Sequence, residues 1–358
     1  MERSTIRSRG GKPPMGATRG ELSLPARRPT MTDVANAAGV SQTTVSLVLN
    51  HTDGARLSAH TRERVMKAAA GLGYRPVRRG GVPGTSSATA IGFVCDELST
   101  DPWTSIAFDG VREKAWEHGY TVSVAVTRGD ADMERAVLAQ LTAQPLLGLI
   151  YATINTRQIH APKVPQPAPT VLLNCYVADH SLPSVVPGEI AGGHTATDFL
   201  LKAGHRRIGF INGEPRMEAS RARLKGYRQS LATADLPVDP DLVLEGNWQP
   251  ISGYERTQAL MRLPSPPTAI FCANDLMAIG CYEALRELGM TIPDDVAVMG
   301  YDDREIAQHL HPPLTTVLLP HFEMGVIAAE ILLDAVTGPG NRPQQIKVEC
   351  PLVRRESV

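Results

Sequence analysis

The sequence lacks the usual marks of a membrane protein, a secreted disulfide-bonded protein or a nucleotide-dependent enzyme. No apolar run reaches the roughly 18 residues needed to span a bilayer, and the first residues, MERSTIRSRGGKPPMG, contain no apolar stretch for a secretory signal. The five cysteines are scattered without a CxxC pair, which argues against a disulfide framework or a zinc site. No GxSxG motif occurs, and the segment CDELSTDPW has no GxGxxG to hold a dinucleotide. We therefore predict a cytoplasmic protein with reduced thiols, no cofactor and no membrane contact.

Positive charge is scarce over most of the chain but concentrated at its start. Residues 1–80 hold 14 Lys and Arg against 5 Asp and Glu, a balance of +9, whereas the remainder holds 22 against 32, a balance of −10. This division predicts a basic head that binds a polyanion and an acidic body that does not. Residues 1–29 are rich in Arg, Gly and Pro, which predicts a disordered basic extension.

Residues 30–76 predict a small all-α head of three short helices. The first begins at Thr30 and ends at Gly39, the second is capped by Ser41 and runs to about Leu49, and the third lies between Ser58 and Gly73. The predicted apolar stripes are Met31, Val34, Ala35 and Ala38 in the first helix, and Thr61, Val65, Ala68 and Leu72 in the third. Two helices joined by a short Gly turn form a helix-turn-helix, whose second helix can enter a DNA major groove.

A Gly- and Ser-rich linker, residues 77–89, separates this head from a larger α/β body, residues 90–358. Strands are predicted at 91–94, 121–126, 146–152, 170–174, 207–212, 241–246, 268–273 and 296–301, and helical patterns alternate with them. This alternation predicts parallel sheets, and the echo of IGFV (91–94) in IGFI (208–211) indicates two similar lobes. A ligand is expected between the lobes, outside the carboxyl ends of the strands.

Several motifs occur together in one order: TMTDVANAAGVSQTTVSLVLN, SAHTRERVMKAAAGLGYRP, KAGHRRIGFING, SRARLKGY, FCANDLMAIG, VMGYDD and PPLTTV. On these stretches the chain resembles the LacI/GalR (lactose-repressor) family of bacterial transcription regulators over roughly residues 29–355. The resemblance implies a body like the periplasmic sugar-binding proteins, made of two Rossmann-like lobes. It also implies a homodimer on a pseudo-palindromic DNA operator, a small effector such as a sugar, and a repressor that is not an enzyme.

Two alternative functions compete with this interpretation. A sugar-binding transport protein without a regulatory role would need a signal peptide and no basic head. A metal enzyme could use His309, His311 and His321, but no carboxylate accompanies them by motif. We therefore expect neither a catalytic residue nor a metal ligand.

Leu47 raises the main question about DNA recognition. At 100° per residue it points away from Val45 and so away from the core of its own helix. The resemblance implies that Leu47 meets an apolar base edge such as a thymine methyl, although plain solvent exposure is the alternative. It also implies base reading by Gln42 and Thr43. The remaining expected DNA contacts, mainly to phosphates, are Thr30, Ser41, Thr44, Ser46 and Asn50. For Arg62 and Arg64, phosphate contact and simple solvation both stay open.

The linker departs from the family pattern, in which a short hinge helix inserts a leucine into the minor groove. Aligned without gaps, this chain has Pro83 at the leucine position, with Gly80, Gly81 and Gly84 around it. Because proline and glycine both disfavour a helix interior, we expect a flexible tether, with Val82 as a smaller possible wedge.

The resemblance also implies a set of effector-binding residues. Arg223 matches an arginine that forks onto ligand oxygens, and Trp248 matches an aromatic that lies along a sugar face. Asn174, Asn274 and Asp302 also match family positions in the cleft. Asp96 and Trp103 are expected at the site because they follow the first strand, and His321 because it lies at a changed cavity position. Structural roles compete: Asn274 and Asp275 would also cap the following helix, and Trp248 would also serve as core packing. Leu319 and His321 differ from the family pattern, so the ligand need not be a simple hexose.

Overall fold

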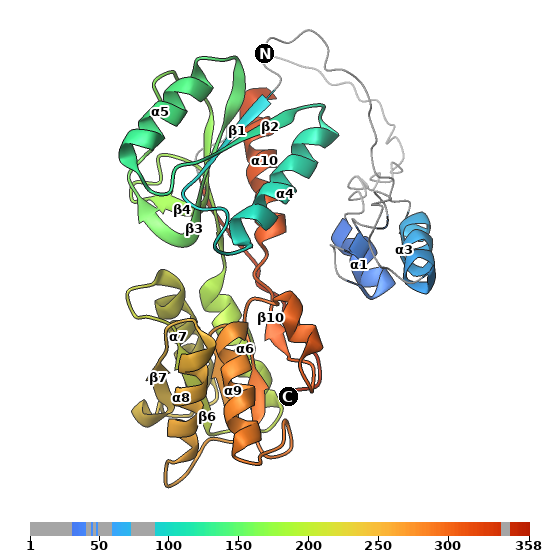
Figure 1. Ribbon diagram of the computed structural model, residues 1–358, viewed down its shortest axis with the longest axis vertical. Coiled ribbons are helices and arrows are strands. Elements are labelled where there is room, and N and C mark those ends of the chain that lie inside the picture. The colour runs from blue at the N-terminus through green and yellow to red at the C-terminus, as the bar shows by residue number, and fades with distance from the viewer. Residues whose placement is uncertain (1–30, 41–43, 46–47, 49–58, 73–89, 338–343) are drawn as a thin grey trace, which may run out of the picture. The chain divides into compact units, whose positions relative to one another are not determined.

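The computed structural model describes residues 31–40, 44–45, 48, 59–72, 90–337 and 344–358 (Figure 1). Contacts within the chain divide it into an N-terminal unit, Met1–Arg78, and a larger unit, Arg79–Val358, which we call the body. Among the described residues, no helix is both long enough and apolar enough to cross a membrane.

The N-terminal unit has a small apolar core between α1, Met31–Ala38, and α3, Ala59–Leu72. Val34 and Ala38 are buried there, as the apolar stripe of the first helix predicts. Helix α1 ends before Gly39, whose φ of +61° is a backbone conformation that glycine adopts at low cost. The predicted position of this helix end is therefore confirmed.

The core-facing side of α3 differs from the predicted stripe. Val65 is buried as expected, but Leu72 is 40% exposed, and Ala69 is buried instead. Leu72 lies in the last turn of α3, which extends beyond this core. The prediction that Leu72 packs inward is therefore wrong.

Arg64 has a structural role within the same unit. Its Nε donates to the carbonyl oxygen of Ala38 at 3.1 Å, and its Nη2 donates to that of Gly39 at 3.0 Å. The last carbonyls of a helix lack partners within the helix, so this contact caps the end of α1. Arg64 is therefore not simply solvated, whereas a phosphate contact of this exposed side chain stays a prediction.

The first lobe of the body is a parallel sheet between helices. Its strand order is β11-β5-β4-β3-β1-β2. The strands are β1 Ala90–Cys95, β2 Thr121–Val126, β3 Leu146–Ile159, β4 Thr170–Val177, β5 Ser184–Pro187 and β11 Gln345–Val348, and the helices are α4 Trp103–Glu117, α5 Ala131–Thr142 and α10 His321–Thr337. Phe93 packs with α4 and α10, and its neighbour Val94 packs with α5 on the other face. Because both faces are covered, β1 is apolar at nearly every position, as the sequence predicts.

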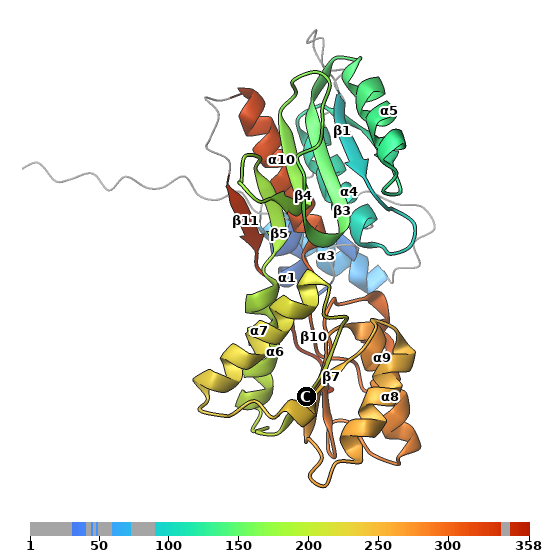
Figure 2. The same ribbon diagram turned by 90° about the vertical axis from the view of Figure 1, so that its left-hand side faces the viewer.

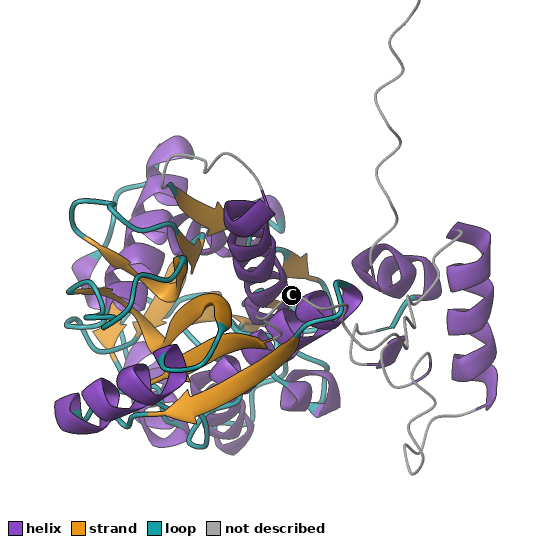
Figure 3. Cartoon of the chain, turned by 90° about the horizontal axis from the view of Figure 1, so that it is seen from above, coloured by secondary structure: helices purple, strands orange, loops and turns teal. Residues whose placement is uncertain are grey.

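The second lobe repeats this plan with a smaller parallel sheet in the order β7-β6-β8-β9. Its strands are β6 Ile208–Asn212, β7 Val243–Glu245, β8 Ala269–Cys272 and β9 Ala297–Met299, and its helices are α6 Glu189–Lys202, α7 Glu218–Thr233, α8 Pro250–Met261 and α9 Asp275–Glu287, with 3-10 turns at Pro240–Leu242 and Glu305–His309. Viewed from above, the strands of the body lie among its helices (Figure 3). The repeated IGF motif opens the first strand of each lobe, which confirms the predicted two-lobed α/β body.

Three segments of the chain connect the two lobes. They follow β5, β10 (Thr316–Val317) and β11, and the last leads into β12 (Leu352–Val353), which pairs with β10 (Figure 2). Strands β5, β10, β11 and β12, which are two to four residues long, are absent from the prediction. Since these connections leave from sheet ends, they bring the carboxyl ends of both sheets to one place.

Candidate functional site: a cavity between the two lobes

A cavity of about 330 Å³ lies between the lobes of the body. This volume is at the small end of the range typical of ligand pockets. The predicted effector-binding residues that line it are Trp103, Asn174, Arg223, Trp248, Asn274, Asp302 and His321. The cavity therefore lies where the strand pattern predicts a ligand.

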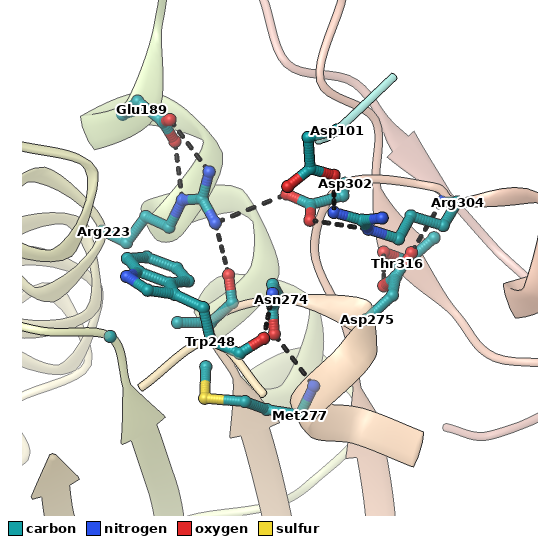
Figure 4. Close-up of polar contacts among 12 residues, drawn as sticks. Asp101, Glu189, Arg223, Trp248, Asn274, Asp275, Met277, Asp302, Arg304 and Thr316 are labelled. Carbon is teal, nitrogen blue, oxygen red and sulfur yellow. Dashed lines mark hydrogen bonds and ion pairs between the residues drawn. The ribbon is translucent and has the colours of Figure 1, made fainter. Parts of the chain in front are cut away.

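Arg223, on α7, is the most firmly held of these side chains (Figure 4). It is 3% exposed, its Nε donates to Glu189 Oε2 at 2.7 Å, and its Nη2 donates to Glu189 Oε1 at 2.9 Å. Its Nη1 donates to the carbonyl oxygen of Ala273 and lies 3.6 Å from Asp302 Oδ1. Although burial alone would lower the pKa of Arg223, the carboxylate of Glu189 raises it above its usual range.

Glu189 lines the cavity and is absent from the predicted site. It is the first residue of α6 and is 7% exposed. A glutamate in the first turn is ordinary helix chemistry, because it complements the positive end of the helix dipole. The sequence therefore carries no local signal that this carboxylate reaches Arg223, 34 residues further along the chain.

Asn274 and Asn174 line the cavity, and their side chains also form hydrogen bonds with backbone groups around it. Asn274 caps α9: its side chain accepts from the Met277 N–H at 2.9 Å, and its Nδ2 donates to the Trp248 carbonyl at 3.1 Å. Asn174 has a φ of +59°, and its Nδ2 donates to the carbonyl oxygens of Thr153 and Ile154 at 2.9 and 3.0 Å. Each amide thus serves the fold while it faces the cavity.

Asp275 does not line the cavity, although it stands beside Asn274. Its two carboxylate oxygens accept from the Thr316 hydroxyl at 2.7 Å and from the Arg304 N–H at 2.8 Å (Figure 4). These contacts tie α9 to β10 and to the loop after β9. Burial raises the pKa of Asp275 to about 7, although both hydrogen bonds act to lower it.

Trp103 forms the wall that belongs to the first lobe. Its ring stacks on His321, with centroids 5.1 Å apart, and the Arg304 guanidinium carbon lies 4.7 Å from its centroid. Arg304 also pairs with Asp101, so this contact joins the two lobes. Burial, together with the nearby charge of Arg223, lowers the pKa of His321 to about 3, so the imidazole is neutral near pH 7.

Trp248 belongs to the opposite wall and lies directly on a glycine. A Cβ atom at Gly213 would come within 2.0 Å of the Trp248 ring, so only glycine leaves room for the indole there. The Arg223 guanidinium carbon lies 5.5 Å from the Trp248 centroid. Within the described chain, the buried Trp248 Nε1 has no hydrogen-bond partner. Core packing and cavity lining are therefore both properties of this residue.

Asp302 lies between the two walls and is buried. Its Oδ2 is 3.6 Å from Arg304 Nε, and its Oδ1 is 3.6 Å from Arg223 Nη1. Burial raises the pKa of Asp302 well above its usual range, against the opposing effect of both arginines. Leu319, also in the lining, is 8% exposed and gives this part of the cavity an apolar surface.

Two family profiles match the chain, one near each end. A profile described as "Bacterial regulatory proteins, lacI family" matches residues 30–77, and one described as "Periplasmic binding protein-like domain" matches residues 197–358. The ribose operon repressor of Haemophilus influenzae is 32% identical over 330 residues, which is 92% of this chain and 98% of that protein. The chain belongs to the LacI family of bacterial regulatory proteins.

Solved structures agree with this family membership. The complex of the transcriptional regulator CelR with cellobiose is 33% identical, with a TM-score of 0.63, over 92% of this chain and 100% of that one. The lac repressor dimer bound to operator and an anti-inducer is 28% identical, with a TM-score of 0.64, over 92% of this chain and 99% of that one. This LacI-family chain is therefore a DNA-binding transcriptional regulator and not an enzyme.

Asp96 is placed differently from its prediction as an effector-binding residue. Its carboxylate accepts from the Ile154 N–H at 2.9 Å and from Arg157 Nη2 at 2.7 Å, and it is not among the lining residues. The register of β3 against β4 shifts between Ala152 and Arg157, and Asp96 holds this irregular segment. The Asp96 carboxylate is therefore used for hydrogen bonds within the protein, because the bulge in β3 turns these donors toward it.

The predicted DNA contacts of this LacI-family regulator fall mostly outside the described residues. Thr44 is described, and it is helical and half-buried next to the buried Val45. Thr30, Ser41, Gln42, Thr43, Ser46, Leu47 and Asn50 lie outside, as does the linker with Pro83. Their contacts with DNA therefore remain predictions.

The histidines of the alternative metal site are also placed. His309 ends the 3-10 turn after β9, and His321 begins α10. Within residues 90–337 and the other described ranges, no group of three His, Cys, Asp or Glu side chains is arranged to hold a metal ion.

Proposed function

We propose that this LacI-family chain is a cytoplasmic, homodimeric repressor whose affinity for a pseudo-palindromic operator is set by a small polar effector, a sugar or a related compound. The observation that carries the proposal is the cavity, which is lined by both lobes of the body. A ligand that touches both lobes favours one lobe arrangement over another and shifts the equilibrium between them. Coupling of this kind is typically worth about 1 to 3 kcal/mol.

The lining of the cavity supports a polar effector with a ring. Trp103 and Trp248 provide aromatic surface on the two sides, and Asn174, Asn274 and Asp302 add amide and carboxyl groups between them. Small-molecule sites typically combine apolar or aromatic walls with a few placed polar groups. The names of the similar proteins also support a sugar, since one is a ribose operon repressor and another is in complex with cellobiose.

The basic N-terminal segment supports operator binding. Its balance of +9 over residues 1–80 supplies phosphate contacts, and the lac repressor, a relative, is bound to operator as a dimer. In this proposal Gln42 and Thr43 contact base edges, and Leu47 contacts an apolar edge such as a thymine methyl. Sequence specificity then depends on these three side chains, whereas most of the affinity depends on charge.

Operator binding is tested first. Selection from random duplexes gives an operator, and fluorescence anisotropy of the full chain measures its affinity between about 50 and 200 mM salt, over which we expect a steep loss. Leu47→Arg should shift the selected consensus toward guanine at one position in each half-site, by about 1 to 3 kcal/mol. A flat salt dependence would contradict phosphate binding, and an unchanged consensus would mean that Leu47 is merely exposed.

Effector control is tested next. A thermal-shift screen of sugars, polyols and nucleosides identifies ligands, since a ligand at 100 times its dissociation constant adds about 2.7 kcal/mol of stability. The selected ligand is then added to the anisotropy experiment. We expect a change in operator affinity of roughly 5- to 150-fold. A ligand that stabilises the chain but leaves operator affinity unchanged would instead favour a binding protein without a regulatory role.

A further inference from the structure

The guanidinium of Arg223 faces the cavity, but its fork is already occupied. A guanidinium fork matches the two oxygens of a carboxylate or phosphate, and here both oxygens come from Glu189, at 2.7 and 2.9 Å. The third nitrogen donates to the carbonyl oxygen of Ala273. Every nitrogen of Arg223 therefore has an acceptor within the protein.

An anionic ligand cannot take this fork without a cost. Glu189 is 7% exposed, so its displacement would leave a buried carboxylate without a partner. The two helices that carry the pair also leave little room for adjustment: a Cβ at Gly193 of α6 would come within 2.5 Å of the Arg223 carbonyl oxygen. The pair is thus held in register by the close contact between α6 and α7.

The other cations at the cavity are also paired, but less completely than Arg223. Arg304 pairs with Asp101, and its buried Nε, which has no hydrogen bond among the described residues, lies 3.6 Å from Asp302 Oδ2. Arg216, whose side chain is exposed, pairs with Glu214 at 2.9 Å. His321 adds no positive charge near neutral pH, because burial and the charge of Arg223 lower its pKa to about 3. Of the described residues that line the cavity, none therefore offers an unpaired cation.

We infer that Glu189 is a specificity-determining residue, which neutralises Arg223 and restricts the cavity to uncharged polar effectors. Phosphorylated and carboxylated compounds of the same size are excluded, because they would meet a paired guanidinium and four carboxyl groups, those of Asp101, Glu189, Glu214 and Asp302. A neutral ligand instead adds hydrogen bonds to groups that stay in place. This inference rests on the proposed role of the cavity as the effector site.

The test uses Glu189→Gln in the full chain. Glutamine keeps the length of the side chain and one acceptor for Arg223, but it removes the negative charge. We expect no calorimetric binding of inorganic phosphate or ribose 5-phosphate to the wild type, and at least tenfold tighter binding of both to Glu189→Gln. The matched control is Asp198→Asn, which removes a carboxylate from the same helix, where it pairs with the exposed Lys202. This control should leave the affinity for both anions unchanged.

The wild type alone provides a second measurement that does not depend on the folding of the variant. Ribose is compared with ribose 5-phosphate, and adenosine with its monophosphate, by calorimetry. We expect the neutral member of a pair to bind at least tenfold more tightly. Tighter binding of a phosphorylated member to the wild type, or a folded Glu189→Gln chain that gains no anion affinity, would overturn the inference. Either result would leave operator binding and effector control intact, whereas a failed proposal for the function would appear in the anisotropy experiment.

Discussion

Arg223 and Arg304 line the same cavity, but the protein holds them in different ways. Arg223 is 3% exposed, and its partners Glu189 and Ala273 belong to the same lobe as Arg223 itself. Arg304 is 17% exposed, and its partner Asp101 belongs to the other lobe. Arg223 belongs to a group of contacts within one lobe, Arg223, Glu189 and Trp248, which we call the rigid wall. The strength of the contact between Arg304 and Asp101 instead depends on the distance between the lobes. In our proposal, Arg223 with Glu189 determines which ligand fits, and the Arg304 pair responds to the lobe arrangement that the ligand favours.

A second contact between the lobes is polar and partly exposed, as is the pair of Arg304 with Asp101. The hydroxyl of Tyr176, on β4, donates to Glu218 Oε2, on α7, at 3.0 Å. Like Arg304, it links polar groups across the gap rather than apolar ones. Such partly exposed contacts are individually weak, which allows a small ligand to change their balance.

The largest predicted effect follows from breaking the rigid wall. Arg223→Ala leaves Glu189 buried and unpaired, so we expect the free energy of unfolding to fall by about 3 to 5 kcal/mol. Effector affinity should also fall, because the loss of Arg223 releases Glu189 from its fixed position in the lining of the cavity. Denaturant titration and calorimetry measure the two effects.

The double variant Arg223→Met with Glu189→Gln serves as the control. It removes both charges, and we expect it to be more stable than Arg223→Ala because no buried charge is left alone. Operator affinity without effector should stay close to that of the wild type in both variants. Equal destabilisation of the single and double variants would show that Glu189 is not held as an ion pair.

Much of the body could be predicted because its signals are local. Long apolar runs such as 146–152 are typical of buried parallel strands, and the turn at Gly39 follows from glycine chemistry. Two-residue strands such as β10 have no such pattern. Their positions depend on pairing with segments far along the chain.

The residues of the candidate site differ in the same way: some are marked by local motifs, and others depend on contacts between distant segments. Arg223 and Trp248 could be placed by motif, because the resemblance aligns them with known cavity positions. Glu189 could not, since its role depends on how α6 packs against α7. The position of Asp96 after β1 predicts a place in the site, but the bulge in β3 that engages Asp96 has no sequence signature. Contacts between distant segments are thus the part that local patterns do not contain.

A second prediction perturbs the rigid wall without touching its ion pair. In Gly213→Ala the new methyl group would stand within 2.0 Å of the Trp248 ring, so the indole must move. We expect a loss of about 1 to 3 kcal/mol in unfolding free energy, as is typical of overpacking, together with weaker effector binding. Gly119→Ala is the control, because the new methyl group meets open space there; the positive φ of Gly119 adds a backbone strain that Gly213→Ala lacks, yet effector affinity should stay unchanged. Unchanged effector affinity in a destabilised Gly213→Ala would assign Trp248 to packing alone.

A third prediction concerns acid. The folded pKa of His321 is about 3, whereas its ordinary value is 6.5, so below about pH 6.5 the unfolded chain binds a proton that the folded chain does not. This residue therefore lowers stability as the pH falls, by about 1 kcal/mol between pH 6.5 and 5.5. Asp275 and Asp302, whose pKa values are raised, act in the opposite direction. The measurement is the unfolding free energy of the wild type and of His321→Gln at several pH values. As the pH falls from 6.5 to 5.5, the wild type should lose stability relative to the variant. Parallel curves for the two proteins would place a solvated, titrating imidazole at this position.

The smallest effect on stability, and the sharpest test of the comparison, comes from the contact between the lobes. Arg304→Ala breaks a partly exposed pair, so we expect a loss of only about 0.2 to 1 kcal/mol in unfolding free energy. If Arg304 responds to lobe arrangement, the change in operator affinity that a saturating effector produces should nevertheless become smaller. Arg135→Ala, which breaks the exposed pair with Asp132 on α5, should cost as little stability and leave the effector response intact. Anisotropy with and without effector separates the two variants. An Arg304→Ala chain that keeps the full effector response would show that this pair is only a surface contact and that the coupling runs through other groups of the cavity.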